Sequence, residues 1–198
     1  MHVFVEKIFG FVLPKIFTPP TEDMLLKNKP SLAKIPTELV VTSSAFEDGQ
    51  HMPWKYGGEG VGEDTSPPLT VENIPSDTGS LVFVLQDLDV PLPKPITHTV
   101  AYNLPVQKEF PEGYFDSKES SDKLTCGKAF RGHTGYLGPR PIINHGPHRY
   151  YFTIYAIKQE APRLNPLVEE PELIAYLEKW AVSTGTVIGT FERTDAKH

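Results

Sequence analysis

The sequence predicts a mainly β protein, a β-sandwich with helices at its periphery. Several apolar runs alternate with a period of two residues, as strands do. Twenty prolines are scattered between these runs, which is typical of long, rigid connections. The one clear helical pattern comes late in the chain, without the strand–helix–strand alternation of a parallel sheet. At 198 residues the chain is long enough for a single domain with a sizeable core.

The first segment, MHVFVEKIFGFVLPKIF, predicts a short amphipathic helix. Four apolar residues lie at helical spacing, namely Val5, Ile8, Phe9 and Val12. Charged residues interrupt the apolar run, and no small-residue cleavage pattern follows, so neither a membrane span nor a secretory signal is indicated. The helix is expected to dock on the body of the protein or on a second subunit. Docking on a second subunit would give a homodimer. We divide the single domain 1–198 into an N-terminal helix and connection (1–36) and a β-sandwich core (37–193).

Three strands are predicted in the first half of the chain. They are TELVVT (37–42), the very apolar SLVFVLQDLD (80–89) and HTVAYNLP (98–105), with a proline-rich loop between the last two. The stretch 44–69 carries many glycines and prolines and predicts a long surface connection. The polar stretch 108–130 has no clear period and is also expected to lie on the surface.

A central strand and a helix are predicted in the second half. HRYYFTIYAI (148–157) alternates so that Tyr150, Phe152, Ile154 and Ala156 share one face and Tyr151, Thr153, Tyr155 and Ile157 the other. Because both faces are largely apolar, this strand should be covered on both sides. EEPELIAYLEKWAV (169–182) has an apolar helical face and acids in its first turn, with Gly185 expected just past its end. A closing strand, TVIGTF (186–191), follows.

Charge and cysteine content exclude several functions. The formal net charge is −6 and no basic block occurs, so nucleic acid is not an expected partner, and the N-terminal helix lacks the basic face of a membrane-binding helix. The single cysteine, Cys126, cannot form an internal disulfide, so we expect an inert thiol in a reducing, cytoplasmic compartment. There is no CxxC, no His pair at a known metal-ligand spacing, no phosphate-binding loop and no GxSxG. No metal or other cofactor is expected.

The first polar cluster is QDLDVPLPKPITH. Asp87 and Asp89 end a buried strand, Pro91 begins a restricted loop, and His98 opens the next strand. An aspartate that leaves an apolar strand needs hydrogen-bond donors, and a histidine could supply one and have its tautomer fixed in return. The alternative is that the two aspartates simply cap a turn.

The second cluster is GYLGPRPIINHGPHRY. Gly135 and Gly138 permit backbone angles that other residues resist, while Tyr136, His148 and Arg149 supply donors. Such a loop can direct backbone N–H groups and an imidazole at an anion. The alternatives are a structural histidine and an ion-paired arginine.

Together the two segments resemble the signature segments of the phosphatidylethanolamine-binding protein family, in the branch of bacterial and fungal Raf-kinase-inhibitor-like proteins. DLDVP followed by a histidine matches the first signature, and GYLGPRP followed by HRY matches the second. Weaker similarities at SPPL, NLP and GTFER extend the resemblance from about Thr37 to Arg193.

The resemblance implies a Greek-key β-sandwich with a small pocket for phosphate, phosphoryl headgroups or carboxylates. The family's pocket residues carry over to Asp87, Pro91, His98, Gly138, Pro141, His148 and Tyr150. It also implies a cis peptide bond before Pro91.

Some positions depart from the family pattern. Leu88, Val90 and Ile142 replace the family's proline, alanine and second proline. Ile96 and Thr99 stand where aromatic residues often flank the first histidine, so the wall becomes branched and aliphatic, which argues against a phospholipid headgroup as ligand. His145 is an additional imidazole, which we interpret as an exposed loop residue, the alternative being a second donor.

Two functions follow from the resemblance. One is an enzyme or accessory factor of fungal secondary-metabolite biosynthesis that acts on maleic-anhydride-type or other carboxylates, with Asp87, His98 and His148 as its catalytic residues. The other is a non-catalytic regulator or inhibitor of a kinase or of a serine carboxypeptidase. Both use a small anionic ligand or carboxylic acid as partner, and the residues alone do not decide between them.

Overall fold

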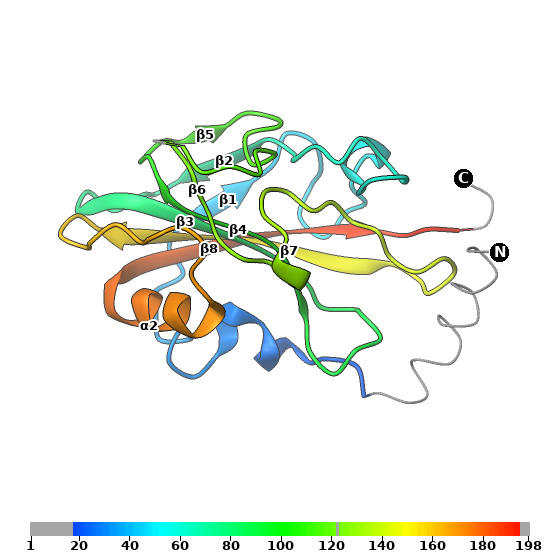
Figure 1. Ribbon diagram of the computed structural model, residues 1–198, viewed down its shortest axis with the longest axis horizontal. Helices are drawn as coiled ribbons and strands as arrows, with labels where there is room; N and C mark the ends of the chain where they lie inside the picture. Colours follow the sequence, from blue (N-terminus) through cyan, green and yellow to red (C-terminus); the bar gives the residue numbers. More distant parts are fainter. Residues whose placement is uncertain (1–17, 122, 195–198) are drawn as a thin grey trace.

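Two antiparallel sheets pack face to face in the computed structural model, which describes residues 18–121 and 123–194 (Figure 1). The smaller sheet has the order β1–β2–β5, and the larger has the order β6–β4–β3–β7–β8. The strands are β1 (Val40–Thr42), β2 (Leu69–Glu72), β3 (Thr78–Asp87), β4 (Ile96–Leu104), β5 (Glu109–Phe110), β6 (Thr125–Cys126), β7 (His148–Lys158) and β8 (Ala181–Phe191). The predicted mainly β sandwich is confirmed.

The larger sheet is covered on both faces, which explains its continuous apolar strands. Along β3, Leu81, Phe83 and Leu85 face the smaller sheet, whereas Val82 and Val84 face the opposite side. Successive side chains of a strand point to opposite faces, so an apolar run without alternation is expected where both faces are buried. The two faces predicted for the 148–157 strand divide between the same two cores, apart from Tyr151, which lies in a small third cluster, and Thr153, which hydrogen-bonds to Thr186.

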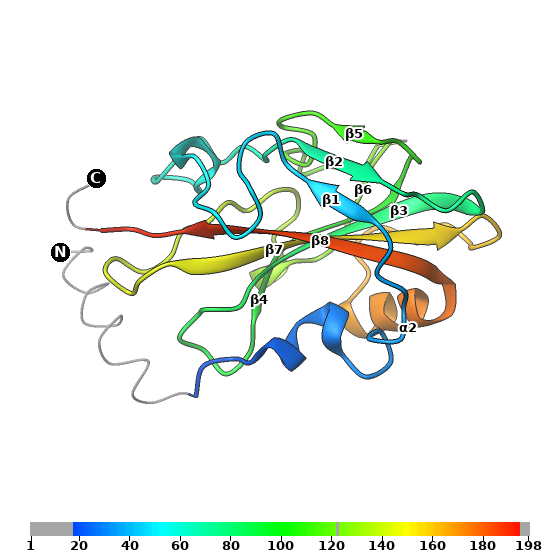
Figure 2. The ribbon, with the colours of Figure 1, turned by 180° about the vertical axis from the view of Figure 1, so that it is seen from behind.

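The second face of the larger sheet is covered by α2 (Glu170–Trp180) and by the segment that precedes β1 (Figure 2). That segment contains two short 3-10 helices, η1 (Glu22–Met24) and η2 (Leu26–Asn28). Two others, η3 (Trp54–Tyr56) and η4 (Phe130–Gly132), lie in the connections. The helices are therefore a minor part of the described fold, and the predicted N-terminal helix over Met1–Phe17 lies outside the described residues.

Three details of the prediction are wrong. The helix α2 passes directly into β8, and Gly185 lies within that strand rather than at a helix end. The connection 44–69 is not confined to the surface, because Met52 and Tyr56 are buried. The polar stretch 108–130 contributes two short strands, and it buries Phe110, Phe115 and Leu124 in the core between the sheets. None of the helices in the described parts of the chain is long and apolar enough to cross a membrane.

Candidate functional site

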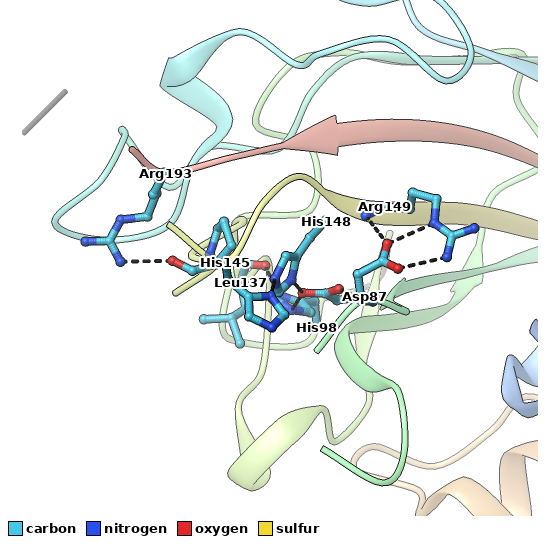
Figure 3. A network of polar contacts seen from close by, with 9 residues as sticks. Asp87, His98, Leu137, His145, His148, Arg149 and Arg193 are labelled. Atoms are coloured by element: carbon cyan, nitrogen blue, oxygen red, sulfur yellow. Dashed lines mark hydrogen bonds and ion pairs between the residues drawn. The ribbon is translucent and has the colours of Figure 1, made fainter. Parts of the chain in front are cut away.

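The candidate site lies where three strands of the larger sheet meet at one end. Asp87 is the last residue of β3, His98 is near the start of β4, and His148 is the first residue of β7. Antiparallel pairing places Asp87 beside both Ile96 of β4 and Tyr150 of β7. The topology therefore brings together side chains from both sequence clusters, as Figure 3 shows.

Asp87 is the buried centre of this cluster, with 2% of its surface exposed. His148 Nδ1 donates a hydrogen bond to Asp87 Oδ2 at 2.9 Å, and His98 Nε2 lies 3.9 Å from the same oxygen. The backbone N–H of Asp89 donates to Asp87 Oδ1, also at 2.9 Å. Asp87 therefore holds a histidine, as predicted, and it also caps the turn after β3. Asp89 does not cap this turn, because its carboxylate accepts hydrogen bonds from Arg149.

His98 is buried, and only one of its two ring nitrogens has a hydrogen-bond partner among the described residues. Its Nδ1 donates to the carbonyl oxygen of Leu137 at 2.8 Å, whereas Nε2 has no hydrogen-bond partner among the described residues. Burial lowers the pKa of His98, although the nearby Asp87 acts in the opposite direction. The ring is therefore held neutral near pH 7, with the proton on Nδ1 and a bare acceptor at Nε2.

Tyr150 supplies a second polar atom without a partner. Its side chain is completely buried, its hydroxyl has no hydrogen-bond partner among the described residues, and its ring meets the His98 ring edge-on with centroids 5.3 Å apart. Burial, and then the carboxylate of Asp87, raises the pKa of Tyr150 well above its ordinary value. The carboxylate acts through its charge and as a nearby acceptor, although its position does not meet the geometry of a hydrogen bond. The hydroxyl consequently keeps its proton and can act as a donor.

His145 is not the exposed loop residue that was expected. It is half-buried, and its Nδ1 lies 2.8 Å from Nε2 of His148, with the two rings in an edge-on contact. Burial, and then the neighbouring His148, lowers the pKa of His145 against the opposing effect of Asp87 and Asp89. The two histidines and Asp87 thus form a continuous chain of hydrogen bonds.

Arg149 forms an ion pair and does not face the cluster. Its guanidinium donates to both carboxylate oxygens of Asp89 at 2.8 and 2.9 Å, and its backbone N–H donates to the same group at 2.7 Å. Burial acts to raise the pKa of Asp89, but the hydrogen bonds from Arg149 outweigh it and hold that pKa below its ordinary value. Glu22 of η1 also accepts a hydrogen bond from Arg149. The alternative of an ion-paired arginine is therefore confirmed.

The glycine-rich loop is held in place by neighbours that the sequence did not identify. Gly138 N–H donates to Asp64 Oδ1 at 2.8 Å, and the hydroxyl of Tyr136 donates to the carbonyl oxygen of Tyr56 at 3.0 Å. Arg193, which is 9% exposed, donates to the carbonyl oxygen of Pro141 at 3.1 Å. Of these neighbours only Arg193 had a sequence signal, since it ends the GTFER similarity.

The two predicted proline positions have structural roles. Pro141 is buried and presents its carbonyl to Arg193, and Pro91 is buried in the loop between β3 and β4. The expected cis bond before Pro91 is wrong, because no cis peptide bond occurs among residues 18–121 and 123–194. Asp87 caps the turn instead, and Leu88 N–H donates to the carbonyl oxygen of Arg149 at 3.2 Å, which continues the pairing of β3 with β7 by one residue.

The donor set does not form a metal site. Within the described parts of the chain, no three or more His, Cys, Asp or Glu side chains are arranged to hold a metal ion.

Comparison with known proteins gives consistent matches. The family model for phosphatidylethanolamine-binding proteins matches residues 42–192. A UPF0098 protein of Pyrococcus abyssi is 35% identical over 158 residues, which cover 79% of this chain and 86% of the relative. A UPF0098 protein of Aquifex aeolicus is 31% identical over 154 residues, covering 77% and 88%.

Solved structures agree in fold. A phosphatidylethanolamine-binding protein homologue from Chlamydia trachomatis matches with a TM-score of 0.67 at 28% identity, covering 79% of this chain and 99% of that one. YbcL of E. coli matches with a TM-score of 0.69 at 23% identity and the same coverage, which shows a common fold. The matched range includes every residue of the buried cluster.

Proposed function

Because this chain belongs to the phosphatidylethanolamine-binding protein family, we propose that its buried cluster binds a small oxyanion that carries a proton, such as a hydrogen phosphate or the monoanion of a dicarboxylic acid. The cluster consists of Asp87, His98, His148 and Tyr150, all of which are less than 8% exposed. The family resemblance supports an anion as ligand, and the hydrogen-bonding state of the cluster supports the proton.

The observation that carries the proposal is the pair of buried polar atoms without partners, His98 Nε2 and the Tyr150 hydroxyl. A buried donor or acceptor that makes no hydrogen bond costs about 1–3 kcal/mol, so such groups call for an explanation. The two rings are in contact, with centroids 5.3 Å apart, so one small ligand could serve both atoms. A bound ligand that forms hydrogen bonds with both atoms would remove this unfavourable free energy.

The two atoms need different hydrogen-bond partners from a ligand. His98 Nδ1 already donates to Leu137, so the bare Nε2 of the neutral ring needs a donor. The Tyr150 hydroxyl needs an acceptor. A protonated oxyanion offers an O–H and an acceptor oxygen together, and its proton also reduces repulsion from the carboxylate of Asp87.

Removing the Tyr150 hydroxyl tests this proposal. We expect Tyr150→Phe to weaken phosphate binding about 10- to 100-fold in calorimetric titrations at pH 6.5, because one hydrogen bond to a charged ligand is lost. Tyr155→Phe is the matched control, since Tyr155 is also on β7, is also fully buried and also has an unpartnered hydroxyl, but packs in the other core. Equal affinities of the two variants would contradict the assignment of the site.

Catalysis remains a prediction. The Asp87–His148 hydrogen bond is an arrangement that general bases use, and it keeps the enzyme hypothesis, with Asp87, His98 and His148 in catalytic roles, alongside simple binding. Regulation of a kinase or of a serine carboxypeptidase, a homodimer, a single domain and a cytoplasmic location also stay predictions.

A further inference from the structure

His145 occupies the one nitrogen of His148 that a ligand could use. His148 Nδ1 is engaged with Asp87, and His148 Nε2 lies 2.8 Å from Nδ1 of His145. Since an imidazole nitrogen has a single site for a hydrogen bond, no ligand can bond to Nε2 while His145 does. His148 is 2% exposed, whereas His145 is only half-buried, so His145 is the more accessible of the two rings.

The carboxylate of Asp87 fixes one proton of this chain. Because that carboxylate only accepts, His148 carries a proton on Nδ1. In the 2.8 Å contact between His148 Nε2 and His145 Nδ1, one nitrogen donates and the other accepts. His145 therefore satisfies His148 Nε2 at the position where an oxyanion with both an O–H and acceptor oxygens could satisfy it in either role.

We infer that the His145 ring blocks the candidate site by its hydrogen bond to His148 Nε2, until a protonated oxyanion displaces it. We call the His145 ring in this role the plug. The inference rests on the proposed function of the cluster. It makes His148 a third contact for the ligand, next to His98 and Tyr150, but only after the His145 ring has left.

The loop around His145 is anchored through its backbone. Asn144 N–H donates to the carbonyl oxygen of Arg193, and His145 N–H donates to that of Ile142. The flanking Asn144 and Gly146 have left-handed backbone angles, with φ of 60° and 98°, so the chain turns sharply on both sides of His145. Displacing the ring from His148 would not break these backbone hydrogen bonds.

The charged surroundings agree with a neutral plug. The carboxylates of Asp87 and Asp89 favour a proton on His145, whereas its burial and His148 disfavour one, and the second effect is larger. The guanidinium of Arg149 is bound to Asp89, and that of Arg193 donates to Pro141, so each has a partner away from the His145 ring. At pH 7 the His145 ring is consequently neutral.

Calorimetric titration with inorganic phosphate at pH 7 tests the plug. We expect His145→Ala to bind phosphate about 3- to 10-fold more tightly than the parent protein, because the ligand no longer competes with a hydrogen bond. His145→Gln retains a side chain that can donate or accept a hydrogen bond and should stay within about twofold of the parent. His51→Ala, at an exposed histidine outside the cluster, should leave the affinity unchanged.

The possible outcomes separate this inference from the proposed function. If the parent binds phosphate and His145→Ala binds it equally or more weakly, the plug is wrong and the site stands. Binding by His145→Ala alone supports a plug that closes the parent completely. If neither protein binds phosphate, the proposed function fails and the plug fails with it.

Discussion

Asp87→Ala is expected to lower the free energy of unfolding by about 3 kcal/mol. The carboxylate is buried and accepts hydrogen bonds from His148 Nδ1 and from the backbone N–H of Asp89, both at 2.9 Å. Hydrogen bonds to charged groups contribute about 1.5–3 kcal/mol each, and their loss leaves one buried donor on His148 without a partner. Urea unfolding at pH 7, followed by fluorescence, measures the change.

The control for this variant is Asp77→Ala. Asp77 is exposed, and exposed substitutions of this kind usually change stability by no more than about 0.5 kcal/mol. If the two variants differed by less than about 1 kcal/mol, Asp87 would not hold the end of β3 and the start of β7 together.

Gly138→Ala should destabilise the protein by about 2–3 kcal/mol and weaken phosphate binding at the same time. A Cβ at this position would lie 2.6 Å from the Tyr56 carbonyl oxygen, 2.7 Å from the Gly58 nitrogen and 2.8 Å from the Gly57 carbonyl carbon. All three are backbone atoms that cannot rotate away, so the loop would have to move, at the cost that overpacking usually brings. Thermal and urea unfolding with calorimetric phosphate titration check both effects.

Gly146→Ala is the comparison within the same loop. Its backbone is left-handed, so alanine costs about 1 kcal/mol there, but the added methyl group meets no atom within 4 Å. A loss of stability at Gly138 no larger than that at Gly146 would mean that the close contact with the 56–58 segment does not position the loop.

The strands could be predicted because their burial leaves a pattern in the sequence. The larger sheet is covered on both sides, so β3 has a continuous apolar run over 81–85, and β7 is largely apolar and aromatic over 150–157. Phe110, Phe115 and Leu124 could not be found in this way, since each is an isolated apolar residue in a polar segment. The same limit applies to Gly185, because a glycine after a helical pattern is compatible with either a helix end or a strand.

The residues of the site could be predicted from the sequence, but the hydrogen bonds between them could not. Asp87, His98 and His148 stand at the ends of strands, and antiparallel pairing brings strand ends together. Which histidine binds the carboxylate depends on side-chain geometry that spacing does not encode. His145 was misjudged because loop histidines are usually solvated, whereas here the chain turns back through Asn144 and Gly146.

The most direct test of the central claim is the ratio of phosphate to sulfate affinity at pH 7, measured by calorimetry. The two anions have the same shape, but sulfate carries no proton at this pH and cannot donate to the bare His98 Nε2. A site that needs an O–H rejects the analogue without one, so we predict that phosphate binds at least about tenfold more tightly. Because burial lowers the pKa of His98, this preference should shrink only as the pH falls below about 6.5, where the ring can gain a proton. Sulfate binding as tight as phosphate binding at pH 7 would contradict the account.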